Sequence, residues 1–298
     1  MSFLSKAYFH HESEACAQME SILWSEGRVC PHCGTVDKST HLKGVRTKPS
    51  RKNPEGVERD GLYKCKDCRK QFTVRKGTIF EESHLPMHKW LQAIYLMVSS
   101  KKGFSAHQMH RVLEVQYKTA WFLCHRIREA MRSGSLTPMG GGGGDVEVDE
   151  TFIGREPGAV VKPGYQHKMK VFSLVDRQTG QARSVVVDTL GASTVWPIVQ
   201  ENVDKETRIL TDEVRHYRGI GWHFEDHQTV HHGKGEYVRL SERDVHTNTV
   251  ENYFSVFKRG MKGVYQHCAK KHLHHYLAEY DFRYNHRSAN GIEDGERA

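Results

Sequence analysis

The chain has 298 residues, enough for two or three domains of ~100–200 residues with at least one buried core, which excludes a peptide hormone or a fibre. Its 44 lysines and arginines exceed its 36 aspartates and glutamates, and the net charge of +8 favours a polyanionic partner without identifying it. No segment approaches the ~18 apolar residues of a membrane span, and the N-terminus lacks the apolar core of a secretory signal, so we expect a cytoplasmic protein without a membrane partner.

Four cysteines near the N-terminus form a repeated pattern. Cys30 and Cys33 are followed, after 31 residues, by Cys65 and Cys68 with the same Cys-x2-Cys spacing. The odd total of seven cysteines argues against a disulfide framework, whereas two such pairs are typical of a structural, tetrahedral Zn²⁺ site with no position open to water. The alternative is two unrelated pairs of free thiols. We expect a zinc ribbon with a leading helix over residues 1–83.

Helical periodicity marks the rest of the N-terminal part. A tight turn, EVQY, separates the last two predicted helices, and the second of them carries Arg126 and Arg128 near its end. Two short helices around a tight turn, with basic residues on the second, fit a helix-turn-helix, which we place within residues 84–134. The helices predicted in this part of the chain cover residues 11–25, 86–97, 105–113 and 118–131.

Five consecutive glycines, residues 140–144, interrupt the chain. Such a run is typical of a flexible linker, which we assign to residues 135–144. Beyond it the apolar pattern becomes that of strands, and residues 145–298 form the last domain, in which the His- and Gly-rich stretch 223–234 is expected to be poorly ordered. The elements predicted in this domain are strands at 145–149, 170–176, 182–188 and 208–212 and helices at 193–203, 247–260 and 270–283.

Two aspartates end two of these strands. Asp149 ends the first predicted strand and Asp212 ends the fourth. If the two strands are neighbours, as in a sheet built from a three-stranded meander and a crossover helix, both carboxylates emerge at adjacent edges and can hold a hard divalent cation. Taken singly, Asp149 is better explained as a turn or cap residue and Asp212 as a helix N-cap.

The helix predicted at 247–260 has a buried face and a polar face. The apolar stripe, which recurs at helical spacing and is expected to pack on the sheet, consists of Val250, Phe254, Phe257 and Met261. The polar stripe beside it consists of Asn248, Glu251, Ser255, Lys258 and Lys262. Two interpretations compete for Glu251: a capping box with Asn248 as N-cap, and a metal ligand beside the two aspartates.

Three sequence blocks, VEVDETFIG, ILTDEVRHY and HTNTVENYFSVFKRGMKG, resemble those of the DDE transposases of bacterial insertion sequences. The paired cysteines and the predicted helix-turn-helix resemble the N-terminal half of the same proteins. The resemblance covers residues 15–290 and is most specific around Glu251. It implies an α+β or α/β fold in which an RNase H-like mixed sheet flanked by helices follows a zinc ribbon and a helix-turn-helix.

The resemblance also implies the catalytic chemistry. Asp149, Asp212 and Glu251 would hold two catalytic Mg²⁺ (or Mn²⁺) ions beside the structural Zn²⁺ of the ribbon. The reaction would be in-line displacement at phosphorus, in which an activated water cuts the DNA end and a DNA 3′-hydroxyl is later joined to the target. No covalent protein intermediate is required.

Basic residues complete the implied site. Lys258, with Arg259 and Lys262 nearby, would hold the phosphate backbone of the DNA end being cut. Arg126 and Arg128 would contact DNA from the helix-turn-helix. The expected partner is double-stranded DNA, as the terminal inverted repeats of the element and as target DNA, bound by a homo-oligomer.

Two other functions fit the same residues. A metal-dependent nuclease would cut DNA without joining it. A DNA-binding regulator would use the zinc ribbon and the helix-turn-helix while the carboxylates are merely structural. Strand transfer of a 3′-hydroxyl end distinguishes a transposase from the nuclease, and metal-dependent cutting distinguishes both from the regulator.

Overall fold

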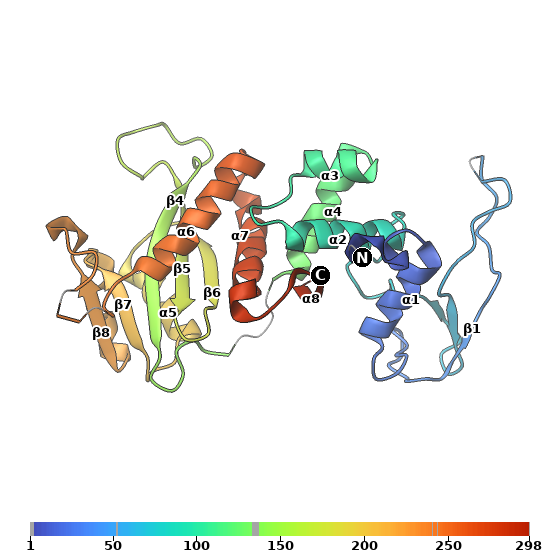
Figure 1. Cartoon of the computed structure of the whole chain (residues 1–298), viewed down its shortest axis with the longest axis horizontal. Coiled ribbons are helices and arrows are strands. Elements are labelled where there is room, and N and C mark those ends of the chain that lie inside the picture. The colour runs from blue at the N-terminus through green and yellow to red at the C-terminus, as the bar shows by residue number, and fades with distance from the viewer. Residues whose placement is uncertain (1–2, 52, 133–136, 240, 243, 298) are drawn as a thin grey trace. The chain divides into compact units, whose positions relative to one another are not determined.

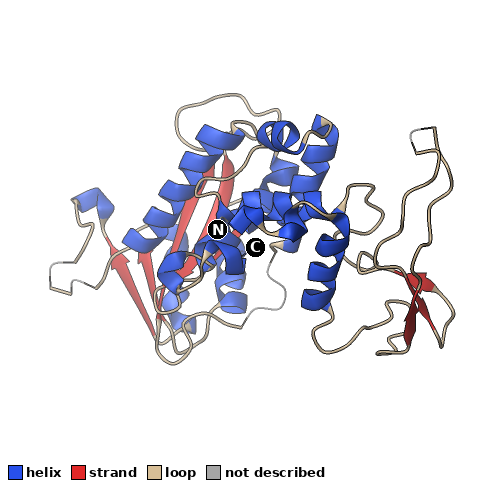
Figure 2. Cartoon of the chain, turned by 45° about the vertical axis from the view of Figure 1, so that its right-hand side comes forward, coloured by secondary structure: helices blue, strands red, loops and turns tan. Residues whose placement is uncertain are grey.

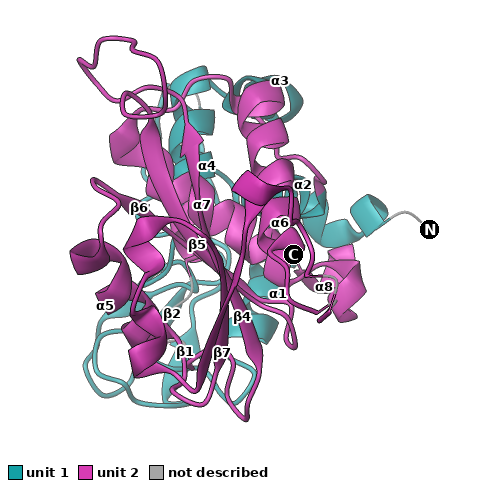
Figure 3. Ribbon diagram, turned by 90° about the vertical axis from the view of Figure 1, so that its left-hand side faces the viewer, with its two compact units in different colours: residues 1–99, 106–127, 298 teal, residues 100–105, 128–297 magenta. Residues whose placement is uncertain are grey.

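The computed structural model describes the chain except for residues 1–2, 52, 133–136, 240, 243 and 298 (Figures 1 and 2). The chain divides into two compact units (Figure 3). The N-terminal unit comprises residues 1–99 and 106–127, and the C-terminal unit comprises residues 100–105 and 128–297. Within the described part of the chain, no helix has the length and apolar character needed to cross a membrane.

A small three-stranded sheet follows the first helix of the N-terminal unit. The strands are antiparallel, and the sheet buries few apolar side chains because the surrounding segment is polar. Its buried cluster consists of Cys30, Tyr63, Cys65 and Phe72, with Trp24 packed against them. The elements are α1 (Glu12–Leu23), β1 (Ser39–His41), β2 (Tyr63–Cys65) and β3 (Gln71–Phe72). So small a core needs an additional cross-link to be stable.

Three further helices follow this sheet. They are α2 (Met87–Ser99), α3 (Ala106–Leu113) and α4 (Tyr117–Ala130), and the last three residues of α4 belong to the C-terminal unit. All three helices lie where their periodicity predicts them. Glu114, in the turn between α3 and α4, has a φ of 52°, a conformation that allows the tight turn predicted there. That the pair binds DNA stays a prediction.

The C-terminal unit is built on a five-stranded mixed sheet of order β6-β5-β4-β7-β8 (Figure 1). Strands β4, β5 and β6 pair antiparallel, whereas β7 is parallel to β4 and β8 is parallel to β7. The first and fourth predicted strands are therefore neighbours, as expected. The strands are β4 (Asp145–Ile153), β5 (Met169–Asp176), β6 (Ala182–Val187), β7 (Arg208–Asp212) and β8 (Asp226–Val230).

Helices cover both faces of this sheet (Figure 3). Helix α5 (Ala192–Asn202) shares a buried cluster with Val146 and Val148 of β4, whereas α6 (Asn248–Gly260) and α7 (Lys270–Asn285) share another with Ile153. Because successive residues of a strand face opposite sides, even-numbered positions of β4 face α5 and odd-numbered positions face α6. The apolar stripe predicted for α6 is confirmed, with every member buried.

One segment departs from the expectation of poor order over 223–234, because it contains strand β8. The sequence of β8, DHQTV, is polar and lacks apolar alternation, and as an edge strand it pairs with β7 alone. The prediction was wrong because the strand is held by backbone pairing with β7.

Shorter elements complete the chain. They are 3-10 helices at Phe3–Ser5, Ala7–Phe9, Arg215–Tyr217, Ile220–His223, His232–Lys234 and Ser288–Asn290, a π-helical turn at Met261–Tyr265, and α8 (Asp294–Arg297).

The five glycines also differ from the free linker expected over 135–144, of which residues 135–136 lie outside the described residues. Gly140 donates its N–H to Asp176 Oδ2 at 3.0 Å, and Gly144 donates to the carbonyl of Gly140 at 2.8 Å. Positive φ angles at Gly140, Gly142 and Gly143 permit this closed turn. The glycines therefore form an ordered turn that leads into β4.

A buried ion pair lies in the interior of the C-terminal unit. Arg128 Nε donates to Glu279 Oε2 at 2.7 Å, and their side chains are 3% and 0% exposed. Arg283 also contacts this carboxylate, at 3.2 Å. Burial by itself raises the pKa of Glu279, but Arg283 and Arg128 outweigh it and lower the pKa below its ordinary value.

We expect Glu279→Gln to destabilise the protein by about 3 kcal/mol, the lower end for breaking a buried ion pair, because glutamine keeps an acceptor but leaves cationic Arg128 uncompensated. Urea unfolding of the full chain measures this. Glu201→Gln, an exposed change on α5, is the control and should alter the free energy of unfolding by no more than about 0.5 kcal/mol. Equal stability of the two variants would contradict the structural importance of the pair.

Candidate functional site

The parallel pairing of β4 and β7 sets the positions of the two aspartates. Glu147 lies opposite Leu210 in the β4–β7 register, so continuing both strands by two residues brings Asp149 level with Asp212. Positions two apart share a face, so both aspartates lie, with Glu147, on the face of the sheet that α6 covers. The two carboxylates therefore lie side by side at the ends of adjacent strands.

Burial and the charges of nearby carboxylates raise the pKa of both aspartates. Burial, followed by the charges of Glu150 and Asp212, raises the pKa of Asp149 well above its ordinary value. Burial also raises the pKa of Asp212; the N–H of Val214 opposes the shift, and the charges of Glu150 and Glu213 add to it. Two desolvated carboxylates that repel each other favour a bound proton or cation. Their oxygens are the ligands that hard cations such as Mg²⁺ prefer.

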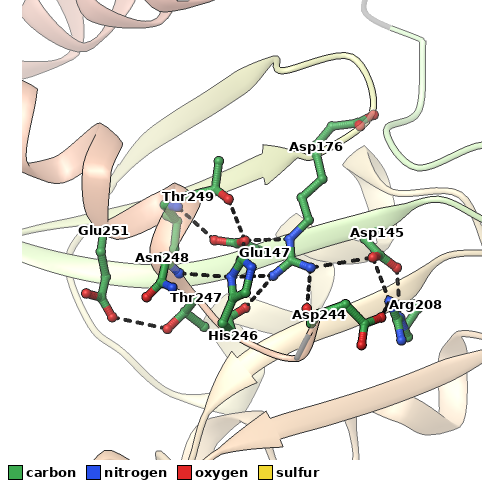
Figure 4. Close-up of polar contacts among 12 residues, drawn as sticks. Asp145, Glu147, Asp176, Arg208, Asp244, His246, Thr247, Asn248, Thr249 and Glu251 are labelled. Carbon is green, nitrogen blue, oxygen red and sulfur yellow. Dashed lines mark hydrogen bonds and ion pairs between the residues drawn. The ribbon is translucent and has the colours of Figure 1, made fainter. Parts of the chain in front are cut away.

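Glu251 lies on the first turn of α6 and is 45% exposed. Its charge contributes to the raised pKa of Asp149. Its Oε1 accepts a hydrogen bond from Thr247 Oγ1 at 3.2 Å (Figure 4) and lies 3.5 Å from His232 Nε2. The predicted capping box is not formed, because α6 begins after Thr247 and the side chain of Thr247 makes no hydrogen bond to the helix backbone. Among the described residues, Glu251 does not join Asp149 and Asp212 in a group whose oxygens all lie within 4.8 Å of one another.

Two cavities of the C-terminal unit share these carboxylates. The larger, of 680 Å³, is lined by Asp149, Asp212 and Lys258, and the smaller, of 460 Å³, by Asp149, Lys258 and Glu251. Lys258 is partly buried, and burial lowers the pKa of its ammonium while the charge of Asp149 raises it. The site therefore combines several carboxylates with a lysine, Lys258, whose pKa is affected by the charge of Asp149.

Further cations surround the cavities. Arg259 and Lys262 are both exposed and line the smaller cavity, and Arg259 Nε donates to the carbonyl of Ser255 at 3.2 Å. Lys168, which the sequence analysis did not single out, lines the larger cavity and lowers the pKa of Lys258 further. The three cations predicted on and after α6 thus lie together beside the carboxylates.

The two arginines of α4 lie in different surroundings. Arg126 donates to the carbonyl of Glu81 at 2.8 Å and places its guanidinium 5.6 Å from the ring centre of Trp90. Arg128 is buried and paired with Glu279. These contacts favour structural roles for both side chains and give no geometric support to their prediction as DNA contacts.

Sequence reasoning missed two carboxylates of β4. Glu150 faces the α5 side, where its Oε2 accepts from Tyr217 Oη at 2.6 Å and lies 3.2 Å from His216 Nε2. Glu147 is completely buried on the α6 side. Glu150 follows Asp149 directly, and that adjacency was the only available signal. Nothing local distinguishes Glu147, because its partners come from distant segments.

The four ribbon cysteines converge. Sγ of Cys30 lies 3.7 Å from Sγ of Cys68, and Sγ of Cys33 lies 3.7 Å from Sγ of Cys65, with all four atoms within 4.8 Å of one another. A tetrahedral Zn²⁺ with bonds of ~2.3 Å requires sulfur atoms ~3.8 Å apart, which these distances match. Hydrogen bonds with the side chain and backbone of Thr35 lower the pKa of Cys33 to about 6, which favours the thiolate that a metal binds.

Comparisons with known proteins find matches in both parts of the chain. The chain matches the ISXO2-like transposase domain over residues 142–285 and the transposase zinc-ribbon domain over residues 10–71. It is 27% identical, over 92% of its length and 91% of the relative's, to an uncharacterized protein in transposable element ISH50 of Halobacterium salinarum. Its similarity to a simian T-cell lymphotropic virus intasome solved with PP2A regulatory subunit B56 gamma has a TM-score of 0.32 and 11% identity. That match covers 65% of each chain, less than two thirds of either.

The two matched domains, one with the four-cysteine cluster and one with the carboxylate-bearing mixed sheet, identify a zinc-ribbon transposase of the insertion-sequence type. Within that class, the chain belongs to the family with the ISXO2-like transposase domain.

We expect Cys33→Ser to abolish zinc binding and to unfold residues 28–80 while the C-terminal unit stays folded, because this segment buries too little apolar surface to fold without its metal. Elemental analysis should find about one Zn²⁺ per wild-type chain and none in the variant, and limited proteolysis should locate the unfolded segment. Cys268→Ser, which removes a thiol outside the cluster, is the control. Wild-type protein without zinc would contradict the prediction.

Proposed function

We propose that the protein is a DDE transposase that cuts the DNA ends of its insertion sequence and joins them to target DNA by metal-dependent phosphoryl transfer. The observation that carries this proposal is the level placement of Asp149 and Asp212 on adjacent parallel strands, on the face covered by the helix of Glu251. The same arrangement supports an RNase H-like fold for the C-terminal unit.

The residues of the site fit divalent cations. Asp149 and Asp212 offer partly desolvated carboxylates with raised pKa values, and Glu251 lines a cavity together with Asp149. Mg²⁺ or Mn²⁺ bound there would activate the attacking oxygen and stabilise the leaving oxygen at phosphorus. Without a cation, the mutual repulsion of these carboxylates destabilises their charged forms. Glu251 is held by Thr247 and partly exposed, so it is the member of the set most accessible to solvent.

The basic residues around the cavities bind the DNA backbone. Lys258, Arg259 and Lys262 line the same cavity as Asp149 and Glu251, so a phosphate that reaches the site meets cations beside the carboxylates. Contacts to phosphate position the DNA without reading its sequence. The partner is double-stranded DNA, comprising the terminal inverted repeats and the target, held by a homo-oligomer.

The N-terminal unit recognises the element ends. Its ribbon holds a structural Zn²⁺ in the four-cysteine cluster, and α3 with α4 acts as a helix-turn-helix. Since Arg126 and Arg128 are engaged within the protein, exposed cations on the same two helices, such as Arg111 and Lys118, are better placed to contact DNA.

Asp149→Asn, Asp212→Asn and Glu251→Gln should each reduce cleavage and strand transfer by at least ~100-fold, more than the loss expected for residues that only orient a ligand, while DNA affinity remains nearly unchanged. Glu251→Gln is the most informative change, because glutamine can still accept the hydrogen bond from Thr247. The assay measures metal-dependent cutting and joining of labelled element ends, and Glu201→Gln is the charge-matched control. A Glu251→Gln protein that joined ends at the wild-type rate would remove Glu251 from the site. Cutting without joining by the wild type would favour the nuclease.

Lys258→Ala should weaken DNA binding and reduce the steepness of its salt dependence by about 0.9 in the slope of log affinity against log salt, because one phosphate contact is lost. Binding to element ends across a range of salt concentrations measures this. The control is Lys205→Ala, an exposed lysine in the turn before β7, which lines neither cavity. An unchanged salt slope for Lys258→Ala would show that this lysine does not contact phosphate.

A further inference from the structure

Glu147 is a completely buried carboxylate that joins β4 to the start of α6 (Figure 4). Its Oε2 accepts from the backbone N–H of Val250 at 2.8 Å. Its Oε1 accepts from Thr249 Oγ1 at 2.7 Å and from Arg177 Nε at 2.6 Å. Both oxygens are therefore used, and two of the three donors belong to the first turn of α6.

The negative charge of buried Glu147 is compensated by Arg177. Arg177 is its counter-ion and also donates to Nδ1 and to the carbonyl of His246, each at 2.7 Å. Burial, followed by the charge of Arg177, lowers the pKa of His246, so its Nδ1 accepts the bond from Arg177 and does not act as a second cation. Arg177 thus ties the segment before α6 to the same carboxylate.

The start of α6 depends on this contact. The residue before the helix, Thr247, forms no side-chain bond to its backbone, so an acceptor for the free N–H of Val250 comes from the sheet. A carboxylate at this end also interacts favourably with the helix dipole. The residue after Val250 is Glu251, and the residue two positions after Glu147 on the same face is Asp149.

We propose, on the basis of the function proposed above, that Glu147 is a positioning residue that fixes Glu251 relative to Asp149. The Glu147 side chain accepts a hydrogen bond from Val250, the residue before Glu251, and Glu147 lies in β4 two residues before Asp149. It therefore sets the spacing between these two carboxylates across the boundary of strand and helix. Glu147 itself stays beneath the helix and takes no part as a ligand.

The test variant is Glu147→Gln. Whichever way its amide is turned, the NH₂ group faces a donor, either the N–H of Val250 or Arg177, so the contact cannot be reproduced. We expect Mn²⁺ binding in the absence of DNA, measured by the electron paramagnetic resonance signal of free Mn²⁺, to weaken by about tenfold, at the lower end for losing a residue that orients metal ligands. Amide hydrogen exchange at Val250 should become faster.

The matched control is Asp176→Asn. Asp176 is also a buried carboxylate of the sheet that accepts backbone N–H groups, but these belong to Gly140, Gln178 and Thr179 and not to α6. The Asp176→Asn change should lower the melting temperature without changing the Mn²⁺ affinity or the rate of amide hydrogen exchange at Val250. Equal losses of Mn²⁺ affinity in the two variants would overturn the positioning role, because the effect would then follow stability alone.

A second variant covers the case in which Glu147→Gln does not fold. Thr249→Val removes one donor to Glu147 and keeps the branched shape, so a smaller loss of Mn²⁺ affinity in the same direction is expected; an unchanged affinity would overturn the positioning role. The metal site itself is tested separately with Asp149→Asn. Wild-type protein that binds Mn²⁺ no better than Asp149→Asn would contradict the proposed function, whereas binding lost in Asp149→Asn but intact in Glu147→Gln would overturn only the positioning role.

Discussion

The parallel pairing of β4 with β7 is the constraint on which the rest of the C-terminal unit depends. It places Asp149 and Asp212 at one level and on one face, where burial and the charges of nearby carboxylates raise the pKa of both. Such an arrangement costs stability when the carboxylates are charged, and the remainder of the unit compensates for it. Large apolar clusters on both faces of the sheet hold the strands in register, so the two carboxylates cannot move apart to relieve their repulsion.

The charged residues of the C-terminal unit include two groups, buried ion pairs and exposed cations beside the cavities. The buried carboxylates Glu279 and Glu147 are paired with Arg128 and Arg177, and these pairs connect segments distant in the sequence. The exposed cations Arg259 and Lys262 line the smaller cavity beside the carboxylates. Buried pairs thus fix the framework, while the unpaired carboxylates and the exposed cations are concentrated where a polyanion and its metal ions would bind.

The features predicted correctly from the sequence are those that depend on local spacing. The apolar stripe of α6 follows from helical periodicity, and the convergence of the four cysteines follows from the repeated Cys-x2-Cys pairs. The features that were missed depend on partners far along the chain. Strand β8 is polar and is held by the edge of β7, and Glu147 bonds to Thr249 across 102 positions. Arg128 follows the pattern of a surface residue, but it is buried in an ion pair with Glu279, 151 positions away.

The glycine turn before β4 has an evolutionary consequence. Asp149 and Glu150 project through opposite faces of the sheet, so slipping β4 by one residue would exchange them and point Asp149 into the apolar layer beneath α5. An insertion or deletion that precedes β4 must therefore lie before Asp145, the first residue of β4 that pairs with β7. Gly141, Gly142 and Gly143 have no atoms within 4 Å of the place a Cβ would occupy, whereas Gly140 is closely packed against Thr207. The tip of the turn is where related chains can differ in length while the carboxylates keep their places.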